Sequence, residues 1–143
     1  MSLLDSPSMV EIELYYKYVD VNNSRKLVIM DDDKAKSMLK DEEKSKDIEV
    51  LKTKWSLMTW KEQNDVMAMA QQSGGPTGEG RFNFLVYRDA IIKRCLKEWD
   101  ITINEKPIPV SSEAIDQLPG PVVINLYGKF ENLIDYTEEA LGN

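Results

Sequence analysis

The sequence predicts an α+β fold, in which a small N-terminal antiparallel β-unit is followed by a mostly helical unit of about four helices. Three observations predict this class. Apolar and polar residues alternate over 10–19, as in a strand with one buried face. Apolar residues recur every three or four positions over 84–99 and 121–134, which is the spacing of one helix face. A helix-start signature stands between these regions, at 59–62.

Three strands make up the predicted β-unit. The first strand, 10–19, is followed by turn-forming residues at 20–24 and by a second apolar run at 26–30, so the simplest arrangement is a β-hairpin. The apolar face of the first strand consists of Ile12, Leu14 and Tyr16. The strand-like pattern returns over 48–55, where we expect the third strand.

Two long helices are predicted in the middle of the chain. Thr59 and Glu62 fit the capping box, in which the threonine side chain accepts a backbone hydrogen bond and the glutamate reaches back to the first residue. This helix should run to about residue 72, and the strongest helical pattern then covers 84–99. Cys95 is the only cysteine and falls on the apolar face of that pattern, so we expect a buried thiol.

The last third of the chain is predicted to be extended first and helical afterwards. Two prolines prevent helix within 100–110, and a turn is expected at 104–106. Ser112 is predicted to cap a short helix over 113–118. Pro121 suits the first position of the final helix.

A dense run of both charges, 31–47, is the best candidate for a connector between the two units. Its few apolar residues predict a short exposed helix or a mobile connection. We therefore divide the chain into an N-terminal unit, 1–56, and a helical unit, 57–143. Both are small, and we expect them to pack as one compact domain.

The residue types present exclude the commonest catalytic arrangements. The chain has no histidine and one cysteine, so it cannot form a Ser-His or Cys-His nucleophile or a zinc site of the ordinary type. No pair of carboxylates is fixed in a recognisable pocket. We therefore expect a protein that is not an enzyme and has no cofactor.

The charge balance argues against nucleic acid as a partner. The chain has 18 basic and 25 acidic residues, and its net charge of −7 repels phosphate backbones. No apolar run is long enough to span a bilayer, and the N-terminus lacks the pattern of a signal peptide. We expect the chain to stay in a cytoplasm.

Two segments suggest a ligand site, but an ordinary loop explains each of them more simply. The glycine-rich stretch 73–80 lacks the Gly-Lys-Ser/Thr ending of a phosphate loop and is interpreted as a connector. In 20–31, oxygen-bearing residues occupy positions one, three, five and twelve of a calcium loop, but Arg25 replaces the glycine required at position six. A hairpin turn is favoured here, and a divalent-cation-binding module stays an alternative.

Large apolar and aromatic side chains are the remaining candidates for function. Most such residues close a core, but tryptophan and tyrosine are also enriched among the anchors of protein interfaces. The candidates for interface contact are Trp60, Met67, Trp99, Tyr127 and Phe130.

The order of features over 53–136 resembles a family of phage proteins. The segments that carry the resemblance are TWKEQN at 59–64, YRD at 87–89, CLKEWD at 95–100, PIPV at 107–110 and IDQLP at 115–119. This layout is similar to that of the small tail assembly chaperones, and related virion-assembly proteins, of tailed bacteriophages.

The resemblance implies a mostly helical, non-enzymatic protein that acts through protein–protein contacts. Such a chaperone coats the tape-measure protein, recruits tail-tube subunits and leaves the finished tail. The implied partners are other phage tail or virion proteins, in an oligomer or multi-subunit complex, with no nucleic acid, membrane or small-molecule substrate. The implied location is the host cytoplasm during assembly.

The N-terminal β-unit departs from the helical character of these chaperones. It leaves open a structural component that is retained in the virion, such as a tail, neck or capsid-surface protein.

Overall fold

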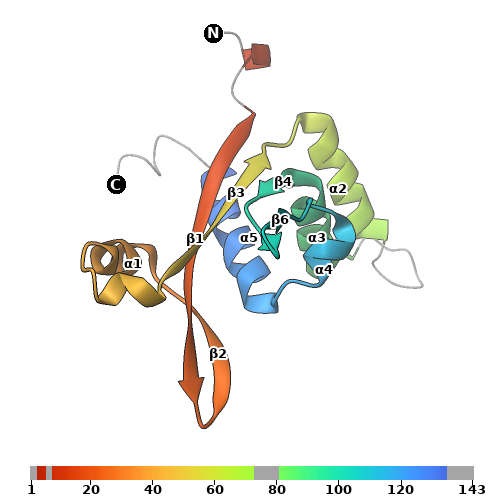
Figure 1. The fold of residues 1–143 in the computed structure, drawn as a ribbon. Coiled ribbons are helices and arrows are strands. Elements are labelled where there is room, and N and C mark those ends of the chain that lie inside the picture. Colours follow the sequence, from red (N-terminus) through yellow and green to blue (C-terminus); the bar gives the residue numbers. More distant parts are fainter. Residues whose placement is uncertain (1–2, 6–7, 73–80, 135–143) are drawn as a thin grey trace.

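The computed structural model describes residues 3–5, 8–72 and 81–134, and it has the predicted α+β arrangement (Figure 1). Four antiparallel strands form one sheet with the order β2-β1-β3-β4. These strands are β1 (Met9–Val21), β2 (Ser24–Ile29), β3 (Glu49–Ser56) and β4 (Leu96–Trp99). The predicted fold class is therefore confirmed.

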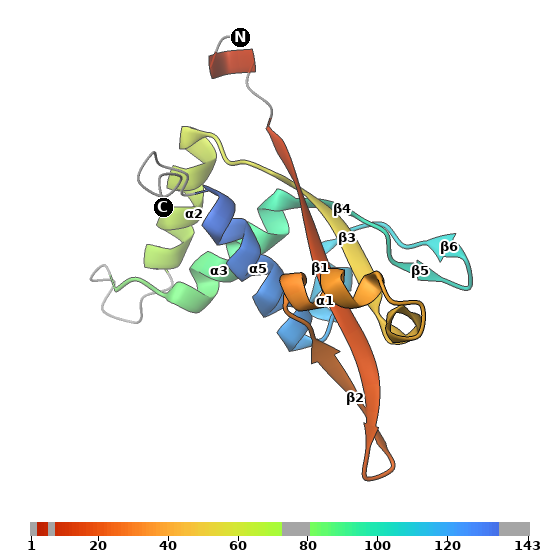
Figure 2. The same ribbon diagram turned by 90° about the vertical axis from the view of Figure 1, so that its left-hand side faces the viewer.

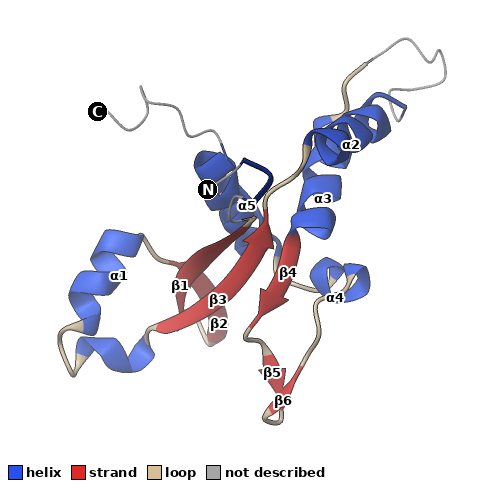
Figure 3. Cartoon of the chain, turned by 90° about the horizontal axis from the view of Figure 1, so that it is seen from above, coloured by secondary structure: helices blue, strands red, loops and turns tan. Residues whose placement is uncertain are grey.

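Helices cover the two faces of this sheet unequally. Three long helices, α2 (Trp60–Gln72), α3 (Phe84–Cys95) and α5 (Gly120–Ile134), lie on one side, and α1 (Asp32–Leu39) lies on the other (Figures 2 and 3). The shorter elements are η1 (Leu3–Asp5), η2 (Lys44–Asp47), β5 (Thr102–Ile103), β6 (Lys106–Pro107) and α4 (Ser112–Asp116).

Alternation along β1 assigns its side chains to two separate apolar clusters. Ile12 and Leu14 point towards α3 and α5 and belong to the main core. Tyr15 points the opposite way and packs with Met30 and with Ala35 of α1. Successive side chains of a strand face opposite sides of the sheet, so one strand serves both clusters.

Trp55 of β3 lies at the centre of the main core and is fully buried. Its ring stacks on Phe130 of α5, with 4.7 Å between the ring centroids. Its indole Nε1 donates to the Thr53 hydroxyl at 2.8 Å, and that hydroxyl donates to the Ile12 carbonyl at 2.7 Å. The tryptophan thus joins β3, β1 and α5 with its one polar atom satisfied.

Two hairpin turns use left-handed backbone at both central residues. These residues are Asn22 and Asn23 between β1 and β2, and Asn104 and Glu105 between β5 and β6. Positive φ at both positions matches the right-handed twist of the adjoining strands, and asparagine is among the residues other than glycine that tolerate it best. The predicted turns at 20–24 and 104–106 are confirmed.

The prediction of helix through residue 99 is wrong at its end. The helix ends at Cys95, Leu96 adopts extended backbone, and β4 pairs with β3 up to Trp99 opposite Thr53. Leu96 and Trp99 fit a helical spacing equally well, but β3 offers an unpaired edge there. Hydrogen bonding to that edge satisfies the backbone outside the helix.

The start of α4 also differs from the prediction. Ser111, and not Ser112, caps the helix, since its hydroxyl accepts from the Ala114 backbone N–H at 3.1 Å. Adjacent serines have equal capping ability, and the backbone at Ser111 is extended as a cap position requires. The helix itself covers Ser112–Asp116.

The two units proposed from the sequence, 1–56 and 57–143, contribute to the same sheet and the same core. β4 and α5 come from the second unit, and they contact β3 and β1 of the first. The predicted boundary itself stays a prediction.

The buried hydroxyl of Thr53 provides a test of the core. Replacing Thr53→Val preserves the shape but leaves the Trp55 indole N–H without its acceptor, so we expect a loss of about 1–3 kcal/mol in the free energy of unfolding. Thr53→Ser keeps the acceptor and serves as the matched control. Urea unfolding followed by tryptophan fluorescence measures both, and a valine variant as stable as the parent would contradict the assignment.

Candidate protein-binding surface

The structure buries the only thiol of the chain. Cys95 is fully buried at the end of α3. Burial, with a smaller contribution from the charge of Glu62, raises the pKa of the Cys95 thiol to about 11. Within the described ranges, no group of three or more His, Cys, Asp or Glu residues is arranged to hold a metal ion.

The calcium-loop hypothesis for 20–31 does not fit the observed backbone. Asp20 pairs with Arg25 across the hairpin, and β2 continues as an extended strand to Ile29. At roughly 3.3 Å per residue, such a strand carries Asp31 about 20 Å away from the turn. The four supposed ligands therefore do not converge, and the hairpin interpretation is confirmed.

The charged segment 31–47 forms α1 and η2, and its first carboxylates have structural roles. Asp31 caps α1 by accepting from the Lys34 backbone N–H at 3.2 Å. Asp32 pairs with Lys129 of α5. The helical alternative predicted for this segment is therefore confirmed.

The glycine-rich stretch 73–80 lies outside the described residues.

The five predicted interface residues fall into different environments. Tyr127 and Phe130 are buried in the main core, so their selection as interface anchors is corrected. Their apolar stripe on α5 faces the sheet, where Phe130 fills the space beneath Trp55. Met67 and Trp99 are partly buried, and the Trp99 indole donates to the Ile108 carbonyl.

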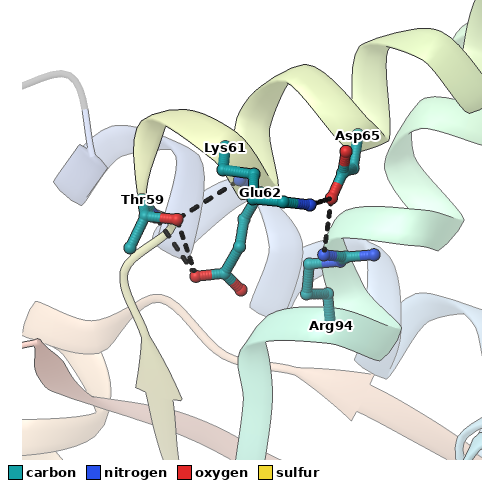
Figure 4. Close-up of polar contacts among 5 residues, drawn as sticks. All are labelled: Thr59, Lys61, Glu62, Asp65 and Arg94. Carbon is teal, nitrogen blue, oxygen red and sulfur yellow. Dashed lines mark hydrogen bonds and ion pairs between the residues drawn. The ribbon is translucent and has the colours of Figure 1, made fainter.

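Trp60 alone among the five is largely exposed, with 76% of its surface accessible. It is the first residue of α2 and follows Thr59, whose hydroxyl accepts from the Glu62 backbone N–H at 3.2 Å (Figure 4). The Glu62 carboxylate accepts from the Thr59 N–H at 3.3 Å, which confirms the capping box. The cap fixes the helix start from which the indole projects.

The start of α2 is also tied to α3 by charge. Asp65 of α2 pairs with Lys61 at 3.0 Å and lies 3.8 Å from the Arg94 guanidinium of α3 (Figure 4). These groups are partly exposed, and such pairs contribute little stability. Only the Asp65–Arg94 pair joins the two helices.

Four exposed apolar side chains belong to residues beside the junction where the end of α2 meets the start of α3. The Asn83 backbone N–H donates to the Ala70 carbonyl at 3.2 Å, which brings these two helix ends together. The side chains next to this junction are Met69, Phe82, Phe84 and Leu85, and we call them the α2–α3 patch. Leu85 is 64% exposed and Phe84 is 48% exposed. Arg88 lies over the Phe84 ring, 5.6 Å from its centroid.

Sequence reasoning missed this patch. The apolar spacing over 84–99 predicts one buried helix face that begins with Phe84 and Leu85, whereas the buried residues of this helix are Ala90, Ile91, Ile92 and Cys95. The start of α3 lies away from the strands (Figure 2), so the sheet does not cover the apolar side chains of its first turn. Asn83, which caps α3 with its side-chain oxygen, marks the start of this uncovered turn.

The buried thiol can be tested directly. Because the pKa of Cys95 rises from 9.0 to about 11, the folded chain at pH 8 has roughly a hundredfold less thiolate than the unfolded chain. We expect alkylation in buffer to be at least that much slower than in denaturant. The folded state should also lose stability as pH rises from about 9 towards 11, because the unfolded chain releases this proton first.

An exposed thiol introduced by Ser112→Cys provides the control for that measurement. It should react in the folded chain at the rate of a free thiol. Equal folded-state reactivity at positions 95 and 112 would show that Cys95 is accessible.

In residues 3–5, 8–72 and 81–134, no helix combines the length and the apolar character that crossing a membrane requires. No protein-family model, curated protein or solved structure matches the chain. Its function must therefore be argued from its own residues and from the surface they form.

Proposed function

We propose that this chain is a tail assembly chaperone of a tailed bacteriophage, a non-enzymatic protein that binds the tape-measure protein and tail-tube subunits in the host cytoplasm. The sequence layout over 53–136 supports the family. The single observation that carries the mode of action is the α2–α3 patch, together with exposed Trp60. Large apolar groups gathered on a surface are typical of protein-binding sites.

The patch suits a helical or unfolded partner. Its side chains include two phenylalanine rings, a leucine and a methionine, which is a flexible side chain that adapts to different surfaces. Arg88 at the rim can keep its charge in water while its stem contacts Phe84. A chain with net charge −7 would also keep an apolar partner in solution.

Co-purification tests the function itself. The chain, co-expressed with the tape-measure and tail-tube proteins of the same phage, should be recovered in complex with one or both. Mass spectrometry of finished virions should not detect it. Its presence there at a fixed copy number would contradict the chaperone and favour the alternative of a retained structural component.

The contribution of the patch can be measured with single substitutions. Leu85→Ser removes an exposed apolar contact, and we expect it to weaken tape-measure binding by about tenfold or more. Trp60→Ser is expected to act in the same direction. Ile103→Ser, at a side chain 60% exposed in the β5–β6 hairpin, is the matched control and should bind normally. Normal binding by both test variants would show that the partner contacts another surface.

A further inference from the structure

We propose that an extended segment of a partner protein, basic and apolar at alternate positions, adds as a strand to the open edge of β1 at Met9–Glu13. This inference goes beyond the proposed function, since it concerns a surface away from the α2–α3 patch and holds for any partner that offers such a segment. It rests on the pairing of β1, on the hollow beside it and on the charges along it.

The first half of β1 is paired on one side only. β3 pairs with Met9–Tyr16, whereas β2 pairs with β1 only from Tyr16 to Val21. The Leu57 N–H donates to the Ser8 carbonyl, so the even-numbered backbone groups of β1 face β3 and the odd-numbered groups face the open edge.

Two of these odd-numbered carbonyls are already occupied. Tyr15 accepts from the Met30 N–H at 2.9 Å, and Glu13 accepts from Lys129 Nζ at 2.7 Å. Among the described residues, the N–H and C=O of Met9 and Glu11 and the N–H of Glu13 have no hydrogen-bond partner. Unpaired backbone groups in a row are the template on which a further strand forms.

Space for that strand exists along the edge. An open hollow of about 530 Å³ runs beside it and is lined by Glu11 and Glu13 of β1, by Asp32 and Lys36 of α1, and by Lys129 and Leu133 of α5. An added strand needs about 4.8 Å of lateral room. The two helices bound the hollow without filling it.

The opposite edge of β1 shows which side chains suit its partner. On β3, Lys54 lies opposite Glu11 and Lys52 lies opposite Glu13. Opposite charges across strands are favourable, so an added strand should place Lys or Arg beside the same two glutamates. Its intervening side chains turn towards the face of the sheet that α3 and α5 cover. Leu133 of α5 lines the hollow on that face, so these side chains should be apolar.

The same charges argue against a second copy of this chain as the occupant. Antiparallel pairing of two β1 edges in the register that overlaps all of Met9–Glu13 places Glu11 of one copy against Glu11 of the other. Like charges directly opposite are destabilising. The acidic chain would add further repulsion between copies.

A short synthetic peptide tests the proposal on the full chain. The probe is a seven-residue peptide of alternating lysine and valine with both ends blocked, and its control carries N-methyl groups on the backbone nitrogens that would face β1. We expect the control, which has the same charge, to bind at least tenfold more weakly, because it cannot donate to β1. Equal affinity would reduce the interaction to charge alone and overturn the proposal, as would no binding by the unmodified peptide.

Two substitutions of Glu11 separate the contribution of its backbone N–H to peptide binding from the contribution of its side-chain charge. Glu11→Pro removes an N–H that faces the open edge and is absent from the β3 ladder, and it should reduce peptide affinity at least tenfold. Glu11→Gln keeps the N–H and should reduce it less. Leu85→Ser, in the α2–α3 patch, should leave the peptide affinity unchanged. Strand addition at β1 and partner binding at the patch can therefore be tested separately. Unaltered affinity of the proline variant would overturn the proposal.

Hydrogen exchange on the parent chain gives a readout that needs no variant. With saturating peptide, the amides of Glu11 and Glu13 should exchange at least tenfold more slowly, while that of Lys61 should not change. Exchange at Glu11 and Glu13 that is insensitive to bound peptide would overturn strand addition.

Discussion

The packing of Trp55 is the interaction on which the rest of the structure depends. A large aromatic ring on the central part of the sheet needs apolar cover on its face and a partner for its indole N–H. Phe130 provides the first and Thr53 the second. Because Phe130 lies on the final helix, this contact links residues far apart in the sequence and seats α5 against β1 and β3. The helices then pack against a fixed sheet, and the first turn of α3 stays exposed.

Much of the fold follows from local rules that the sequence displays. Alternation identified the first and third strands, turn-forming residues followed by an apolar run identified the first hairpin, and Thr59 with Glu62 identified the start of α2. Each depends on residues within a few positions of one another. The fourth strand does not. Leu96 to Trp99 leaves the helical pattern only because the edge of β3 lies beside it, and the sequence around Trp99 carries no sign of that edge.

The candidate surface was less predictable than the fold for a related reason. Periodicity shows that a helix has an apolar face but not how far along the helix that face is covered. Phe130 and Leu85 both lie on apolar stripes, yet the sheet covers one and not the other. The open edge of β1 likewise depends on the short length of β2, which ends its pairing at Tyr16. Tertiary arrangement, and not residue type, decides which apolar groups meet solvent.

The junction between α3 and β4 constrains how this chain can change. Cys95 is the last residue of the helix and Leu96 the first of the strand, with no loop between them. A helix turns about 100° per residue and a strand reverses its side chains at each one. Inserting or deleting a single residue within α3 would therefore rotate Cys95 out of the core or exchange the two faces of β4. This region should accept replacements of one residue type by another while excluding changes in length, so its spacing is fixed more strictly than its composition.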